Sequence, residues 1–393
     1  MEGSFLEKSD SECSDDEESK AEKARIKEMV KAWKPIKDLR DDFRHPDAHK
    51  DGGFPLNDAA VIGRYRNAFK DIVKQLGRTI FSGKFNIGSV SFPISCMSHQ
   101  SILYLIATMS IHSPIFMTRA ALADDKVERM KMVMLTALSF LQPCHVFDKP
   151  LNPILGETLQ GRLGDGTYVF LEQICHHPPI SYICQEGPEK LYRWSGYSSF
   201  TTRVHMNSID LDVKGGKTIV FKDGSVIKYT PHQDKFYNSL WGTLVHCLCG
   251  DSEFEDVQNG ITAKYTIGTK KGRDYITGWI KKDGKQVSEL SGTYMGWIAF
   301  DGVRYWDIRR MQNFALVEPP LDKVITSDWR NRKDTQAHLA GDMATAQVNK
   351  DAQENLQRAD RKLREAAEKR RKEGGPKIDY QPYKNHPLHG RQA

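Results

Sequence analysis

Two kinds of periodicity divide the chain into helical and extended regions. Apolar residues recur mainly at steps of three and four between residues 59 and 76, which predicts an amphipathic helix that ends near Gly77. A second helical region is expected over residues 99–147. The first helix either packs on the core or covers something, and the apolar residues of its second half are Phe69, Ile72, Val73 and Leu76.

The pattern changes between about residue 155 and residue 310. Short runs rich in Thr, Val, Ile, Tyr and Trp are separated by Asp-Gly pairs, which lie at Asp165–Gly166, Asp223–Gly224, Asp283–Gly284 and Asp301–Gly302. Asp-Gly readily adopts the positive φ angles of tight hairpin turns. The region therefore predicts a large antiparallel meander, and a sheet of this size is expected to curl or close because open edges are exposed.

The chain becomes helical again after Pro319–Pro320. Residues 334–373 are dense in Ala, Gln, Lys, Arg and Glu, which favour helix, and Gly341 is a place where two helices could divide. Lys350, Glu354 and Arg358 are spaced by four residues and share one helix face. From the residues alone, they read as two ordinary ion pairs on a solvated surface.

Charge is distributed unevenly along the 393 residues. The net charge of +6 is too small to indicate a nucleic-acid partner, but the first 20 residues carry eight acids against two lysines. Residues 1–25 are therefore expected to be a disordered acidic tail, followed by an N-terminal extension over residues 26–58. Residues 350–377 carry ten bases against six acids, which indicates either a solvated helix face or a surface that meets anionic lipid.

Other features bear on the compartment. The seven cysteines have no regular spacing, which argues against a disulfide framework and for a reducing compartment. The apolar stretch over residues 102–117 is too short to span a bilayer, and the acidic start of the chain does not resemble a secretory signal. A cytosolic protein is expected.

Two polar stretches are candidate sites. In KPLNPILGET, two prolines restrict the backbone and pre-order Lys149 and Asn152, although a rigid loop before the first strand is an equal alternative. In EQICHHPP, His176 and His177 could be an acid/base pair, metal ligands or anion donors. Adjacent side chains on an extended chain point to opposite sides, so joint chelation would need a bend. Binding an anion requires least of them.

These stretches together resemble the oxysterol-binding-protein-related family. EQICHHPP is similar to the family's EQVSHHPP fingerprint and departs from it only at Ile174 and Cys175. KPLNPILGET matches a second family motif, and Lys350, Glu354 and Arg358 with the following ADRK look like a third. The resemblance covers roughly residues 59–375 and suggests a short member with only the lipid-binding domain.

The family resemblance implies an α+β fold. Its centre is a large near-closed antiparallel β-barrel around a lipid tunnel, with the barrel over about residues 155–310 and the C-terminal helices over about 334–373. Residues 59–88 would be a lid with Phe69, Ile72, Val73 and Leu76 on its apolar stripe, residues 89–375 the lipid-binding domain, and residues 376–393 a flexible tail. The implied contacts to a phosphoinositide head group are Lys149, Asn152, His176, His177, Lys350, Glu354 and Arg358, with Glu354 orienting its two cationic neighbours.

The activity implied by the resemblance is lipid exchange. Phosphatidylinositol 4-phosphate would be carried one way, and a sterol or phosphatidylserine the other way, between membranes such as the endoplasmic reticulum, the Golgi and the plasma membrane. Carrying lipid requires no bond-making, so we expect neither an enzyme nor a metal or cofactor. The acidic head could contact a receptor at the endoplasmic reticulum. Two alternatives remain: a sensor or scaffold that binds without transfer, and a metal-dependent hydrolase that uses His176 and His177.

Overall fold

The protein is described from a computed structural model. The structure describes residues 20, 24, 26–29, 31, 33–37, 41–77, 92–141, 149–176 and 178–374. The α-helices in these ranges are α2 (Ala59–Leu76), α3 (Ile102–Thr108), α4 (Pro114–Leu122), α5 (Lys126–Ser139), α6 (Lys333–Leu339) and α7 (Met343–Lys372). Among the described helices, none combines the length and the apolar character that a membrane span requires.

Strands dominate the middle of the chain. Their bounds are β1 (Phe54–Pro55), β2 (Met97–Ser101), β3 (Lys149–Leu151), β4 (Thr158–Leu163), β5 (Tyr168–Cys175), β6 (Ile180–Glu186), β7 (Tyr192–Val204), β8 (Ser208–Lys214), β9 (Lys217–Phe221), β10 (Val226–Tyr229), β11 (Gln233–Tyr237), β12 (Val245–Asp256), β13 (Ile261–Thr269), β14 (Gly272–Lys282), β15 (Lys285–Thr293), β16 (Trp297–Phe300), β17 (Val303–Asp307) and β18 (Leu316–Val317). Sixteen of them form one antiparallel sheet, and β2 and β3 pair separately as a parallel two-stranded sheet.

The expected meander is confirmed. Each Asp-Gly pair lies in the turn between two strands that are consecutive in the chain and paired in the sheet: β4–β5, β9–β10, β14–β15 and β16–β17. At Asp283–Gly284 both residues have positive φ, 50° and 78°, and Asp301–Gly302 repeats this with 53° and 75°. This is the backbone that a two-residue hairpin turn needs in order to match the twist of its strands.

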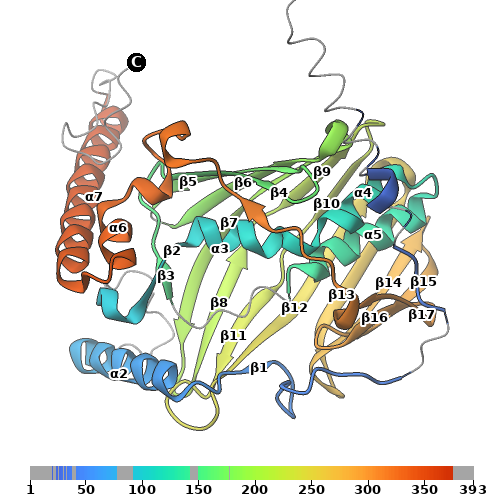
Figure 1. Ribbon diagram of the computed structural model, residues 1–393, viewed down its shortest axis with the longest axis horizontal. Helices are drawn as coiled ribbons and strands as arrows, with labels where there is room; N and C mark the ends of the chain where they lie inside the picture. Colours follow the sequence, from blue (N-terminus) through green and yellow to red (C-terminus); the bar gives the residue numbers. More distant parts are fainter. Residues whose placement is uncertain are drawn as a thin grey trace, which may run out of the picture.

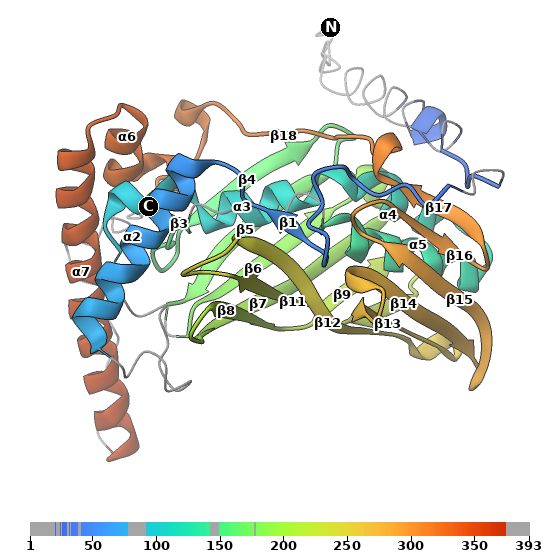
Figure 2. The same cartoon turned by 90° about the horizontal axis from the view of Figure 1, so that it is seen from below.

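The sheet curves around helices α3, α4 and α5 (Figures 1 and 2). Its order is β17-β16-β15-β14-β13-β12-β10-β9-β7-β6-β5-β4-β18, and no pairing between described residues joins the two ends of this path. The α+β architecture and the large antiparallel sheet are therefore as expected, but the strand pairings themselves do not close a barrel.

Two long strands change partner along their length. β7 pairs with β9 through Gly196 and with β8 from Ser199 onward. β12 pairs with β11 through Cys249 and with β10 from Phe254. β8 also pairs with β11, and β9 pairs with β10. The six strands β7, β8, β11, β12, β10 and β9 are therefore paired in a ring. Inside the ring, the described residues of the β8–β11 pair and of the β9–β10 pair are not bonded to each other. We call this place the strand gap.

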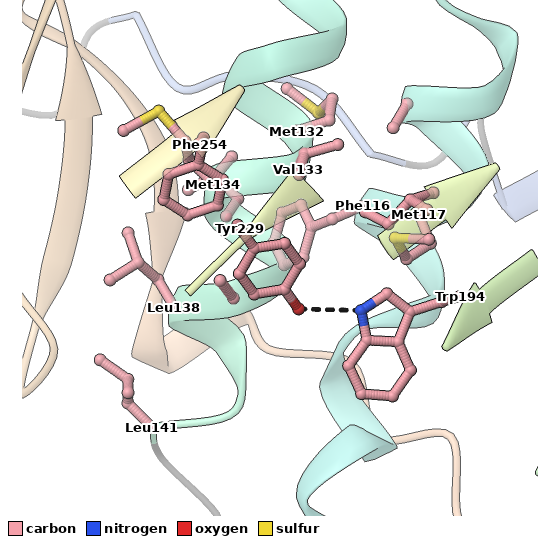
Figure 3. Close-up of a cluster of buried hydrophobic side chains, with 14 of the residues drawn as sticks. Phe116, Met117, Met132, Val133, Met134, Leu138, Leu141, Trp194, Tyr229 and Phe254 are labelled. Atoms are coloured by element: carbon pink, nitrogen blue, oxygen red, sulfur yellow. Dashed lines mark hydrogen bonds between the residues drawn. The ribbon is translucent and has the colours of Figure 1, made fainter. Parts of the chain in front are cut away.

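The core lies between the inner face of the sheet and the three helices. Buried side chains from α4 and α5 meet strand residues there, among them Phe116, Leu138, Trp194, Tyr229 and Phe254 (Figure 3). Trp194 Nε1 donates a hydrogen bond to Tyr229 Oη at 2.9 Å, so the polar ends of two buried aromatic residues satisfy each other. Helix α5 begins at a cap in which the Asp125 carboxylate accepts from the Val127 amide.

The predicted helices are present with small changes in their limits. The helix over residues 59–76 is confirmed as α2, and the C-terminal helices divide at Gly341, whose φ is +79°. The expected helical region over residues 99–147 starts later than predicted, because Met97–Ser101 forms strand β2 beside β3 and Ser101 then caps α3. It is divided into α3, α4 and α5, and its last residues, 142–147, lie outside the described part.

Several expectations concern residues outside the described part. The side chains of Phe69, Ile72, Val73 and Leu76 lie outside it although their backbone belongs to α2, as do residues 1–19, 78–91 and 375–393. The N-terminal extension is described in part and packs against the sheet: the Arg44 guanidinium bonds both carboxylate oxygens of Asp274 at 2.9 and 3.0 Å, and Ile36 pairs with Arg304.

Candidate functional site

The segment KPLNPILGET begins in a short strand at one end of the sheet. β3 pairs in parallel with β2, so that Lys149 lies opposite Met97. Lys149 Nζ donates to Asn152 Oδ1 at 2.8 Å and lies 5.2 Å from the centre of the Phe92 ring. The two polar side chains that the sequence singles out are therefore in contact with each other.

On α7, Glu354 connects the other two residues of its motif. Its carboxylate accepts from Lys350 Nζ at 2.6 Å through one oxygen and from Arg358 Nη2 at 2.9 Å through the other. Lys350 is only 4% exposed, whereas Arg358 is half exposed. The prediction that the three share a face is confirmed, but burial of Lys350 distinguishes this cluster from a pair of fully solvated surface bridges.

The first and third motifs meet in space. Burial, together with the positive charge of Lys350, lowers the pKa of Lys149 to about 8, and the carboxylate of Glu354 acts in the opposite direction. The Leu155 amide also donates to Gln357 Oε1 on α7 at 3.2 Å. Residues about two hundred positions apart in the chain thus share one electrostatic environment.

The histidine motif is connected to the same end of the sheet. The Gly156 amide donates to the Gln173 carbonyl at 2.8 Å, and the Gln173 amide donates to the Glu157 carbonyl at 2.9 Å. Gln173 Nε2 also donates to the Cys175 carbonyl at 2.7 Å, which fixes the turn that carries His176. His176 is half-buried, and His177 lies outside the described residues.

A buried network that the sequence did not indicate holds these segments together. Arg332 Nη1 donates to Glu157 Oε2 at 2.9 Å and to the Asn152 carbonyl at 2.8 Å. The same guanidinium bonds Asp334 through Nε and Nη2, at 3.0 and 2.6 Å. Asp334 in turn accepts from Gln353 Nε2 on α7 at 3.2 Å. Arg332 therefore joins the loop of Asn152 to the helix of Lys350.

The charges in this network are out of reach of water. Burial raises the pKa of Glu157, and its hydrogen bonds to Arg332, Ser101 and the Ile154 amide offset part of that rise. Burial opposes ionisation of Asp334 too, but the Arg332 charge and hydrogen bonds hold its pKa below the ordinary value. Glu157 lies inside KPLNPILGET, which the sequence identifies as a candidate site. Nothing in the sequence marks Arg332 and Asp334 as site residues, apart from their position at the start of a predicted helical region.

The described residues contain no group of three or more His, Cys, Asp or Glu side chains that could hold a metal ion. What they offer at this end of the sheet is three cations, Lys149, Lys350 and Arg358, with the carboxylate of Glu354 between the last two. Such a cluster suits an anion with several acceptor oxygens, because charge-assisted hydrogen bonds to oxyanions are the strong ones.

A protein-family model described as "Oxysterol-binding protein" matches residues 82–307. The chain belongs to the oxysterol-binding protein family. The match includes the motifs of Lys149 and of His176, and it ends before α7. The Lys350–Glu354–Arg358 cluster on α7 therefore lies outside the matched residues. It is linked to them by Arg332, which bonds Glu157, and by Gln357, which bonds the Leu155 amide.

Curated members of the oxysterol-binding protein family match most of the chain. The chain is 29% identical over 355 residues to "Oxysterol-binding protein 9" of Dictyostelium discoideum, covering 83% of this chain and 82% of that protein. It is 25% identical over 332 residues to "Oxysterol-binding protein-related protein 5" of Mus musculus, covering 77% of this chain but only 37% of that protein.

Solved structures of the oxysterol-binding protein family share the fold. The Osh1 ORD domain in complex with ergosterol has a TM-score of 0.65 at 18% sequence identity, covering 92% of this chain and 90% of that one. The Osh3 ORD in complex with PI(4)P from Saccharomyces cerevisiae has a TM-score of 0.62 at 19% identity, covering 89% and 96%. At these identities the likeness establishes the fold alone.

Proposed function

We propose that this protein binds phosphatidylinositol 4-phosphate and exchanges it between membranes for a second lipid, a sterol or phosphatidylserine. The head group would be held by Lys149, Asn152, His176, His177, Lys350, Glu354 and Arg358. The observation that carries the proposal is the convergence of Lys149 with the Lys350–Glu354–Arg358 cluster at the end of the sheet where the histidine turn also begins. Relatives of the same fold include one solved with PI(4)P and one solved with ergosterol.

The site chemistry fits a phosphomonoester. Lys149, Lys350 and Arg358 supply positive charge, and Asn152 supplies an amide donor. Glu354 bonds both Lys350 and Arg358, so it holds their donors in place and does not need to touch the phosphate. His176 and His177 add imidazole donors that become stronger when protonated.

The energetics of lipid transport explain why a carrier needs an apolar interior. Each methylene moved into water costs about 0.8 kcal/mol, so an eighteen-carbon chain faces on the order of 14 kcal/mol. A protein that replaces the hydrocarbon of the membrane removes most of this barrier. In this proposal acyl chains or sterol occupy a tunnel within the sheet, and α2, which lies at the same end of the sheet as α7 (Figures 1 and 2), acts as the lid.

Vesicle assays test the proposal. We expect the protein to extract phosphatidylinositol 4-phosphate from labelled vesicles and to accelerate its movement to acceptor vesicles when the second lipid moves in the opposite direction. Extraction without accelerated transfer would indicate a sensor or scaffold. No extraction at all would refute the proposed head-group site. Mass spectrometry of lipids that co-purify with the protein would identify the second cargo.

A further inference from the structure

A buried lysine lies at the strand gap and belongs to none of the motifs assigned above. β7 leaves β9 after Gly196 and joins β8 at Ser199, so Tyr197 and Ser198 have no strand partner on that side. Lys217 Nζ occupies this position: it donates to the Tyr197 carbonyl at 3.0 Å and to Ser198 Oγ at 2.9 Å.

The side chain of Lys217 belongs to the inner face of the sheet. Lys217, Ile219 and Phe221 alternate with more exposed residues along β9, and Lys217 is only 7% exposed. Its stem crosses Gly196, where an added Cβ would lie 2.7 Å from Lys217 Cδ. The ammonium is 5.6 Å from the centre of the Trp194 ring, which belongs to the buried cluster of Figure 3.

Closing the gap does not require a charge. Gln233 closes the facing side of the same gap with a neutral amide, whose oxygen accepts from the Val213 amide at 2.7 Å and whose nitrogen donates to the Val213 carbonyl at 2.9 Å. Burying an ammonium is far more costly than burying an amide. The charge of Lys217 therefore needs an explanation beyond the strand connection.

Lys217 has no carboxylate within ion-pair distance among the described residues. The protein takes up two of the three donors of its ammonium, and one remains. Burial lowers the pKa of Lys217 to about 8, so the group is still mainly protonated at neutral pH. A buried cation in this state favours a bound anion.

The titratable groups around Lys217 come from the neighbouring strands. Burial lowers the pKa of His232, which lies between β10 and β11. The Asp234 carboxylate raises this pKa, and His246 and Lys217 lower it further. Asp234 Oδ1 lies 3.2 Å from His246 Nε2, so this carboxylate is engaged on β12. Lys214, at the end of β8, is exposed.

We propose that Lys217 and Ser198 bind the oxyanion of an acidic amphiphile, a sulfate or carboxylate, whose apolar body lies against the buried cluster. The cargo would enter with its acidic end first. A phosphoinositide would instead be held by its head group at Lys149 and the Lys350–Glu354–Arg358 cluster. The inference rests on the proposed function as a lipid carrier and adds acidic amphiphiles to the second lipids proposed there.

Matched lipid pairs test this with the full chain. Vesicles containing cholesterol sulfate or cholesterol, and stearate or stearyl alcohol, separate the oxyanion from the apolar body. We expect the native protein to extract the acidic member of at least one pair about tenfold better, since a charge-assisted hydrogen bond contributes at least about 1.5 kcal/mol. Lys217→Gln, which keeps donors for the gap, should lose this preference, and Lys214→Gln, which removes an exposed charge nearby, should keep it.

A pH series on the native protein keeps the test independent of how the variants fold. Between about pH 7.5 and 9.5 the preference should fall, because Lys217 loses its proton while sulfate and carboxylate stay ionised. No preference for either acidic lipid, or a preference that survives in Lys217→Gln, would overturn the inference. Phosphoinositide extraction, measured in parallel, should be unchanged in Lys217→Gln; its absence in the native protein would instead refute the proposed carrier function.

Discussion

Arg332 Nη1 and Glu157 Oε2 form a 2.9 Å ion pair in which neither side chain has appreciable contact with solvent. The pair links the loop that follows Lys149 to the segment that leads into α7. Through Asp334 and Gln353 the link continues into the helix that carries Lys350. The two halves of the proposed head-group site are thus held by buried charges that do not belong to the site.

Removing Arg332 should be costly. In Arg332→Met, Glu157 and Asp334 lose their shared cation while they stay buried, which typically costs about 3–5 kcal/mol for a buried pair. We expect a fall of that size in the free energy of unfolding, measured by urea titration. Arg203→Met is the control, because Arg203 is half exposed and pairs with Asp212 at the surface, where about 1 kcal/mol or less is expected. Similar losses in both variants would contradict a structural role for the buried network.

Glu354→Gln tests the orientation of the two cations. The substitution removes the carboxylate that accepts from both Lys350 and Arg358. We expect phosphatidylinositol 4-phosphate affinity to fall about tenfold, because the loss of a charged hydrogen-bond partner leaves both donors poorly placed. Glu365→Gln is the control on the same helix, since Glu365 is exposed and lies 3.6 Å from Arg361. Tighter binding in Glu354→Gln would mean that Glu354 mainly repels the phosphate.

The histidine pair separates the two cargoes. In the double variant His176→Ala with His177→Ala, extraction of phosphatidylinositol 4-phosphate should be abolished, while extraction of the sterol or phosphatidylserine should remain largely intact. The reason is that only the phosphoinositide would contact the proposed head-group site, to which the two histidines belong. Equal loss of both lipids would contradict this division of the site.

The affinity for phosphatidylinositol 4-phosphate should depend on pH over two ranges. Below about pH 6.5 binding should tighten as the histidines gain a proton. Above about pH 8 it should weaken, because burial and Lys350 lower the pKa of Lys149 to about 8 and the neutral amine no longer attracts phosphate. Isothermal titration with a short-chain lipid between pH 5.5 and about 9 would detect both ranges. A flat profile would exclude His176, His177 and Lys149 from contact with the phosphate.

Two glycines should respond in opposite directions to alanine. Gly284 has φ +78° in the β14–β15 turn, so Gly284→Ala should destabilise the protein by about 1 kcal/mol. Gly63 lies within α2, and an added Cβ would meet nothing within 4 Å, so Gly63→Ala should stabilise that helix by about 0.5–1 kcal/mol. Thermal melts compare the two. Destabilisation by Gly63→Ala would indicate that this face of α2 is covered.

Local sequence determined the elements of this protein. The Asp-Gly pairs identify four hairpins because they supply the positive φ angles that those turns require, and the helical spacing of residues 59–76 is sufficient to predict α2. The fingerprint around His176 and the motif of Lys149 were sufficient to suggest the family. The spacing of Lys350, Glu354 and Arg358 placed them on one face, because four residues are close to one helical turn.

Only the tertiary structure decided which of these residues meet. The proximity of Lys149 to Lys350 and the role of Arg332 depend on contacts between segments about two hundred residues apart, which no local pattern encodes. Lys217 shows the same limit. In the sequence it is one lysine among many, and it becomes a buried charge because β7 changes partner from β9 to β8 beside it and leaves a carbonyl for its ammonium to bind. Burial and desolvation are properties of the packed fold, and they give these side chains their chemistry.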